Sequence, residues 1–132
     1  KYFLAVTQRG LGNYDLAIAE VKKSLIIKET ADSNALLGAI LADRNEPLEA
    51  VKFLRKAISL NPNHFNSHYD LGRLLVKQQK HAEALPILQK AAVLMPANAD
   101  VHYQLFLTYS RLKRKSEADK ELALFKELSD KK

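Results

Sequence analysis

Apolar side chains recur along the chain at intervals of three and four residues, in segments that end in polar and turn-forming residues. This spacing places the apolar residues on one face of an α-helix, so each segment predicts an amphipathic helix. Residues 61–63 and 95–98 place a proline just beyond a helix end, where it cannot continue the helix. The pattern predicts helices paired as hairpins: 1–10 with 13–28, 32–43 with 46–60, 65–78 with 81–95, and 99–112 with 115–129.

A longer period of 34 residues runs over the same segments. Residues 31–64 are identical to residues 65–98 at 11 of 34 aligned positions, and residues 65–98 are identical to residues 99–132 at 7 of 34. One helix pair cannot bury its own apolar face, so a repeated pair predicts stacked hairpins. The residues that return at this interval are mostly small or apolar: Ala50, Ala84 and Ala118; Leu54, Leu88 and Leu122; Ala57 and Ala91; Pro62 and Pro96.

The repeated pattern resembles that of the tetratricopeptide repeat family, in which large residues, a Leu-Gly pair, two alanines and a proline follow at set spacings. The clearest unit reads His68-x-x-Leu71-Gly72-x-x-Leu75, Ala84-x-x-x-Leu88, Ala91, Pro96. The resemblance implies an all-α fold, a right-handed α-solenoid of stacked antiparallel helix hairpins. It predicts one domain over residues 1–132, with a truncated repeat (1–30), two repeats (31–64 and 65–98) and a C-terminal repeat (99–132).

The C-terminal repeat departs from this pattern. Phe106 and Phe125 stand where the preceding repeat has a glycine and an alanine. A bulky ring in a slot that is normally kept small would obstruct a following repeat, so we expect the array to end here. Leu124 and Leu128, together with Phe125, would then close this end or support weak self-association through it.

Composition narrows the classes of function. The chain has no cysteine, which excludes a disulfide framework and a thiolate metal site. Its longest apolar stretch, residues 35–42, is too short to span a bilayer. Because the chain starts at Lys1 inside a predicted helix, we expect the array to extend upstream.

The net charge of +6 leaves a nucleic-acid-binding helical repeat as an alternative. The lysines are scattered along the helices, however, whereas nucleic-acid binding needs a basic stripe or patch. The expected binding face also carries acidic residues, which disfavour a nucleic-acid partner. These acids are Asp32, Asp43, Asp70 and Asp100.

Motifs of catalysis and cofactor binding are missing from the sequence. It has no Gly-x-Ser-x-Gly, no phosphate-binding glycine loop and no His-Glu-x-x-His. His64, His68 and His102 lie at spacings that make a metal site conceivable. His68 and His102 fall in the slot of a large packing residue, and zinc would need a further ligand and outer-shell support. We therefore predict packing histidines, and no catalytic, cofactor-binding or metal-binding residues.

In the family that this chain resembles, the first helix of each hairpin lines a concave groove that receives a peptide or a partner helix. Spacings of three and four residues select one face of each first helix. Tyrosine and arginine on that face are enriched at binding hot spots, and suit a peptide with apolar anchors and carboxylates. The predicted groove residues are Tyr2, Leu36, Asn66, Tyr69, Arg73, Lys77, Tyr103, Gln104, Leu107 and Arg111.

The resemblance therefore predicts a non-catalytic protein–protein interaction scaffold whose partner is a protein or peptide, acidic in character. The alternatives are a nucleic-acid-binding helical-repeat module and an appendage that positions an enzyme domain elsewhere in a longer chain. One subfamily clamps the C-terminal carboxylate of chaperones with basic groove residues. Asp100 and Gln104 stand where that clamp needs basic side chains, so a chaperone-tail clamp is disfavoured.

Overall fold

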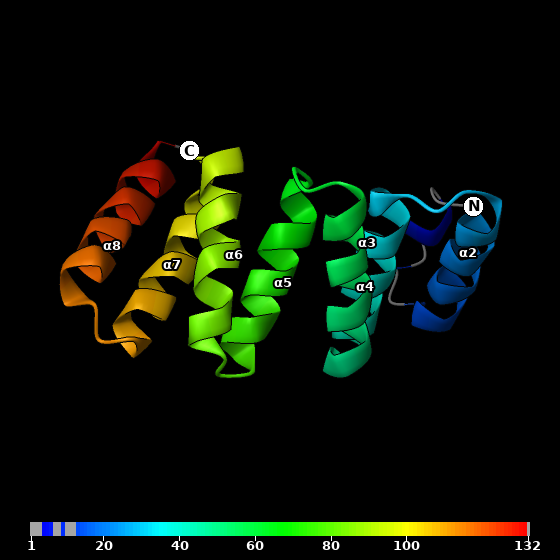
Figure 1. Ribbon diagram of the computed structural model, residues 1–132. Helices are drawn as coiled ribbons and strands as arrows, with labels where there is room; N and C mark the ends of the chain where they lie inside the picture. The colour runs from blue at the N-terminus through cyan, green and yellow to red at the C-terminus, as the bar shows by residue number, and fades with distance from the viewer. Residues whose placement is uncertain (1–3, 7–8, 10–12, 132) are drawn as a thin grey trace. The chain divides into compact units, whose positions relative to one another are not determined.

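The computed structural model describes residues 4–6, 9 and 13–131, and the regular secondary structure of these residues is helical, with no strand among them (Figure 1). Residues 4–6 and Arg9 are helical and precede the labelled helices. The all-α fold predicted from the sequence is confirmed. The helices are α2 (Tyr14–Ile27), α3 (Ala31–Asp43), α4 (Pro47–Leu60), α5 (Phe65–Lys77), α6 (His81–Leu94), α7 (Ala99–Arg111) and α8 (Lys115–Asp130).

The chain divides into two compact units, Lys1–Ser67 and His68–Lys132, and the division falls within α5. In the N-terminal unit, α3 packs against both α2 and α4. In the C-terminal unit, α7 packs against both α6 and α8. The middle helix of each group carries the most buried face, so each unit has a core of its own.

Small residues allow the two helices of a hairpin to approach closely. A Cβ atom added to Gly72 would lie 2.4 Å from Leu88 Cδ2 on α6, and one added to Gly38 would lie 2.7 Å from Leu54 Cγ on α4. Real Cβ atoms do not reach such distances, so these slots accept only glycine without a shift of the opposing leucine. The same leucines are fully buried. The Leu-Gly pair of the sequence pattern is therefore a helix-packing device.

The turns inside the hairpins repeat with the same 34-residue period. Asn45, Gln79 and Lys113 each adopt a positive φ, of 63°, 65° and 61°. In each turn the amide of the positive-φ residue donates to the carbonyl oxygen of the residue three positions before it. The amide of the following residue donates to the carbonyl oxygen of the residue five positions before itself. This is the Schellman arrangement that ends a helix, and glycine is the residue that usually occupies the left-handed position.

Replacing the strained turn residues with glycine should stabilise the protein. We expect Gln79→Gly and Lys113→Gly each to raise the free energy of unfolding by about 1 kcal/mol, because glycine avoids the steric cost of a positive φ. Asn45→Gly should gain less, since asparagine tolerates this conformation better. Urea unfolding measures all three variants. Unchanged midpoints for both Gln79→Gly and Lys113→Gly would show that the positive φ carries no strain.

Side-chain caps begin several helices. Thr30 Oγ1 accepts the amide of Ser33 at 3.0 Å at the start of α3, and Asn98 Oδ1 accepts the amide of Val101 at 3.2 Å at the start of α7. Both residue types favour this position because a short side-chain oxygen satisfies an amide that lacks an intrahelical partner. The caps position the first helices, which carry the predicted groove residues.

Candidate functional site

Seven of the ten predicted groove residues lie on the surface of the C-terminal unit. Arg73, Lys77 and Arg111 are exposed, and the Tyr103 side chain is 39% exposed. The remaining members are half-buried, which leaves them accessible at the surface. We call this surface the α5–α7 face; it consists of Tyr69, Arg73 and Lys77 on α5 and Tyr103, Gln104, Leu107 and Arg111 on α7.

Tyr69 occupies a mixed electrostatic environment on this face. The Arg73 guanidinium lies 5.5 Å from the centre of the Tyr69 ring, within cation–π range, and Arg73 Nη2 lies 3.9 Å from Asp70 Oδ1. Burial raises the pKa of the Tyr69 hydroxyl; Arg73 opposes this increase, and Asp100 and Asp70 add to it. The Asp100 carboxylate, in the first turn of α7, is therefore within electrostatic reach of the Tyr69 hydroxyl on α5.

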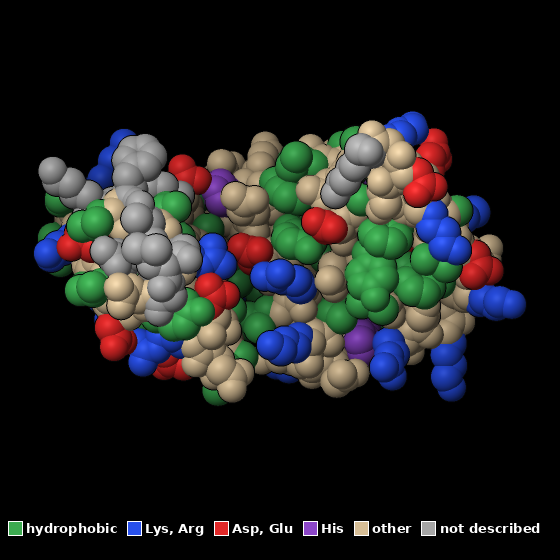
Figure 2. All heavy atoms as spheres, turned by 180° about the vertical axis from the view of Figure 1, so that it is seen from behind, with side chains coloured by type: hydrophobic (Ala, Val, Ile, Leu, Met, Phe, Trp, Pro, Cys, Tyr) green, Lys and Arg blue, Asp and Glu red, His purple; other side chains and the backbone are tan. Residues whose placement is uncertain are grey.

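Tyr103 belongs to an aromatic cluster that links α7 to α8. Its ring centre lies 6.1 Å from that of Phe106 and 5.0 Å from that of Phe125, in tilted arrangements that aromatic pairs favour. Phe106 and Phe125 are the rings that the sequence places in normally small slots. Figure 2 shows hydrophobic side chains gathered on the right of the view, the C-terminal side, with Lys and Arg side chains around them. The Tyr103 side chain is therefore packed against two aromatic rings and still 39% exposed.

The three apolar residues that the sequence pattern assigns to the C-terminal end differ in exposure. Leu124 is 39% exposed, whereas Phe125 and Leu128 are half-buried. The Phe125 ring packs against the Tyr103 ring of the same unit. Self-association through these residues stays a prediction.

Three predicted groove residues fall outside the described residues or outside the C-terminal unit. Tyr2 lies outside the described residues, and Asn66 is exposed but belongs to the N-terminal unit. Leu36 is only 7% exposed, because α3 is buried around most of its circumference. Leu36 therefore offers little surface to a partner, and we do not include it in the binding face proposed below.

The predicted packing role of two histidines agrees with their burial. His68 and His102 are both buried. His102 Nε2 donates to the Pro96 carbonyl oxygen at 2.7 Å, and Nδ1 is hydrogen-bonded to Glu121 Oε2 at 2.6 Å. His102 thus joins α7 to the preceding turn and to α8. Over the described ranges, no group of three or more His, Asp or Glu side chains could hold a metal ion.

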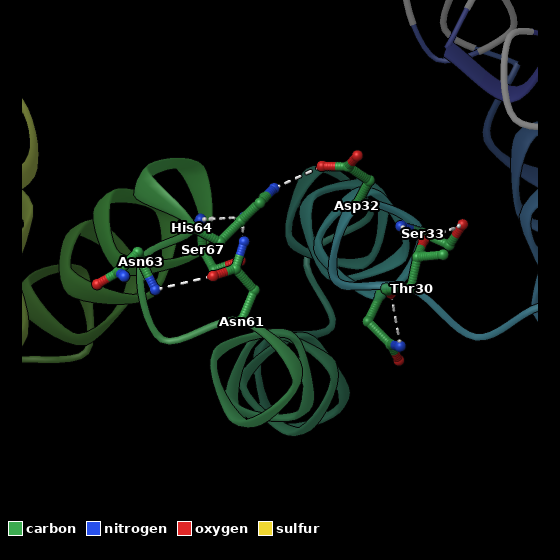
Figure 3. Close-up of polar contacts among 8 residues, drawn as sticks. Thr30, Asp32, Ser33, Asn61, Asn63, His64 and Ser67 are labelled. Carbon is green, nitrogen blue, oxygen red and sulfur yellow. Dashed lines mark hydrogen bonds and ion pairs between the residues drawn. The ribbon is translucent and has the colours of Figure 1, made fainter.

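The structure also contains a Ser–His–Asp arrangement that sequence reasoning missed. His64 Nε2 donates to Asp32 Oδ1 at 2.6 Å, and His64 Nδ1 accepts from Ser67 Oγ at 2.6 Å (Figure 3). The Ser67 amide also donates to Nδ1, at 3.3 Å. His64 therefore caps the start of α5 with a ring nitrogen, and Asp32 orients the ring from the first turn of α3.

This arrangement lacks the accessibility of a nucleophilic site. Ser67 is 0% exposed, so its hydroxyl cannot reach a substrate. The network is best explained as a helix cap that also joins α3 to the start of α5 within the N-terminal unit. No motif of serine nucleophiles accompanies these three residues in the sequence.

A hollow of about 780 Å³ lies in the N-terminal unit, and its position was not indicated by the sequence pattern. Ile27 at its rim is 83% exposed at the end of α2. Its wall combines apolar side chains with both signs of charge. The lining residues are Leu4, Glu20, Lys23, Ser24, Ile27, Lys28, Thr30, Asp32 and Ser33.

Two family models match the chain. One, described as "Anaphase-promoting complex, cyclosome, subunit 3", matches residues 10–91, and the other, described as "Tetratricopeptide repeat", matches residues 75–127. Both describe tetratricopeptide repeat families, and the first covers more than half of the chain. The chain belongs to the tetratricopeptide repeat family. Its general function is that of a protein-interaction scaffold, and proteins of this family are typically non-catalytic.

Solved structures share the fold. MamA from Desulfovibrio magneticus RS-1 is 24% identical with a TM-score of 0.88, over 98% of this chain and 73% of that chain. YrrB, described as a TPR protein with an unusual peptide-binding site, is 23% identical with a TM-score of 0.81, over 94% and 64%. TTC0263, a thermophilic TPR protein from Thermus thermophilus, is 20% identical with a TM-score of 0.80, over 98% and 73%. Among curated protein sequences, none matches the chain.

Membrane crossing requires a long apolar helix. Among the residues that the structure describes, no helix combines the length and apolar character needed to cross a bilayer.

Proposed function

We propose that the α5–α7 face binds an acidic peptide or partner helix and performs no chemistry on it. The observation that carries the proposal is the combination of accessible tyrosine rings with exposed cations on one surface. Tyr69 and Tyr103 offer large, rigid contacts, and the same two helices carry three exposed cations, Arg73, Lys77 and Arg111. Peptide binding by the related fold of YrrB supports this class of ligand.

The charges on this face favour an acidic ligand over a basic one. The α5–α7 face carries three cations, Arg73, Lys77 and Arg111. The carboxylates on the same helices are two, Asp70 and Asp100, so the net charge is positive. Arg73 already lies over the Tyr69 ring, which holds its planar donors beside an apolar contact. Such a pair suits a ligand that places a carboxylate next to an apolar side chain. Buried tyrosine and arginine contacts usually dominate peptide-binding energies.

Substitution of the anchors tests the proposal. Peptides that bind the chain would first be selected from a random display library. We then expect Tyr69→Ala and Arg73→Ala each to weaken the selected acidic peptide by about 2 kcal/mol, roughly 30-fold, because each removes an anchor. Isothermal titration calorimetry measures the loss, and circular dichroism confirms that the variants remain helical.

The matched control is Lys56→Ala, which removes an exposed cation from α4. Its affinity for the same peptide should equal that of the unmodified protein. A larger loss from Lys56→Ala than from Tyr69→Ala would place the binding surface on the second helices and overturn the proposal.

A further inference from the structure

One position on the first helices forms a charged series with the 34-residue period. It holds Arg9, Asp43, Lys77 and Arg111, and we call it the end slot because Asp43, Lys77 and Arg111 end their helices. In the N-terminal unit, Arg9 Nε and Asp43 Oδ2 form an ion pair at 2.8 Å, with side chains 35% and 32% exposed. In this unit, the end slots of two successive first helices are therefore in direct contact.

The C-terminal unit has two cations in the same slot. Lys77 ends α5 and Arg111 ends α7, and both are exposed. Within the described part of the chain, neither side chain has an ion-pair or hydrogen-bond partner. Near the starts of the two helices, burial and, to a smaller extent, the Asp100 carboxylate of α7 raise the pKa of the Tyr69 hydroxyl on α5. The 34-residue period therefore puts two like charges at the same position of neighbouring first helices, where the N-terminal unit has an oppositely charged pair.

We propose that Lys77 and Arg111 jointly bind one carboxylate of the acidic peptide, in the place that the Asp43 carboxylate takes beside Arg9. The inference deepens the proposed function and rests on it. A single carboxylate between the two cations would relieve their repulsion and form two charge-assisted contacts. It would also orient the peptide, with an acidic residue at the helix ends and apolar residues toward Tyr69 and Tyr103.

A double-mutant cycle tests whether the two end-slot side chains are close. Lys77→Asp converts the like-charged pair to the arrangement of Arg9 and Asp43. In the Lys77→Asp background, Arg111→Ala should lower the melting temperature by about 1–3 °C. In the unmodified protein, the same substitution should leave the melting temperature unchanged or raise it. Lys120→Asp, on the exposed face of α8, is the control for the change in charge. Equal effects of Arg111→Ala in the Lys77→Asp and unmodified backgrounds would overturn the inference.

Binding of a defined anion tests the site without a natural partner. The probe is acetyl-hexaglutamate amide, titrated into ¹⁵N-labelled protein and followed by amide chemical shifts, with acetyl-hexaglutamine amide as the neutral control. We expect shifts around Lys77 and Arg111 with hexaglutamate only. Lys77→Gln and Arg111→Gln should each weaken binding about three-fold or more, and Lys120→Gln should not.

The outcomes separate this inference from the proposed function. If the selected peptide depends on Tyr69 but hexaglutamate binding is insensitive to Lys77→Gln and Arg111→Gln, the inference fails and the proposed function stands. If the selected peptide is insensitive to Tyr69→Ala while hexaglutamate responds at the end slot, the peptide proposal fails. If an oligothymidylate binds through the same two residues more tightly than hexaglutamate does, the inference is overturned in favour of a nucleic-acid phosphate.

Discussion

Replacing Gly72 with leucine is expected to lower the free energy of unfolding by about 3 kcal/mol, at the upper end of the usual cost of overpacking. The Cβ atom alone would lie 2.4 Å and 2.6 Å from Leu88 Cδ2 and Cγ. Leu88 is fully buried on α6, so it can yield only by disturbing the core of the C-terminal unit. The gain in helix propensity, about 1 kcal/mol from glycine to leucine, offsets only part of this cost.

Urea unfolding measures this prediction, with Lys90→Ala on α6 as the control. A compensating variant sharpens it: adding Leu88→Ala to Gly72→Leu should recover part of the loss, because the new side chain then fills the space that Leu88 vacates. Equal midpoints for Gly72→Leu and Lys90→Ala would mean that α5 and α6 do not pack in this register.

The variant His102→Ala should cost about 3 kcal/mol of folding stability. It removes the hydrogen bonds to the Pro96 carbonyl and to the Glu121 carboxylate, and leaves both acceptors without this partner. Loss of one member of a buried charged or polar pair typically costs about 1–5 kcal/mol in this way. The buried ring also contributes packing that alanine cannot replace.

The control for His102 is His81→Ala in the same unit. His81 is half-buried at the start of α6, where it forms a 3.1 Å hydrogen bond to Gln79. Its loss should change stability by less than about 0.5 kcal/mol. A melting temperature of His102→Ala close to that of His81→Ala would show that the hydrogen bonds around His102 contribute no net stability.

Much of the fold follows from the periodicity of the sequence. The 34-residue repeat predicts the hairpins, and Gly72 contacts the helix that carries Ala84, as the small-residue pattern indicates. These features are predictable because each is local or recurs in every repeat. A helix end needs only its own turn residues, and a packing slot needs only one pair of facing helices.

Features that depend on a single pair of distant side chains were not predictable. The cap by His64 requires Asp32 to meet its ring across the N-terminal unit, and histidine carries no strong capping preference. The burial of Leu36 depends on how many neighbours surround α3, which spacing along one helix does not report. Similarly, the Phe125 ring packs against Tyr103, whereas the sequence pattern indicated only that Phe125 closes the C-terminal end or supports self-association there.

The central claim is that the α5–α7 face is the peptide-binding surface of this tetratricopeptide repeat protein. Chemical-shift mapping of ¹⁵N-labelled protein with the display-selected acidic peptide tests it most directly. We expect the largest amide shifts along α5 and α7, around Tyr69, Arg73 and Tyr103. Shifts confined to α6 and α8, or to the hollow beside Ile27 in the N-terminal unit, would contradict it.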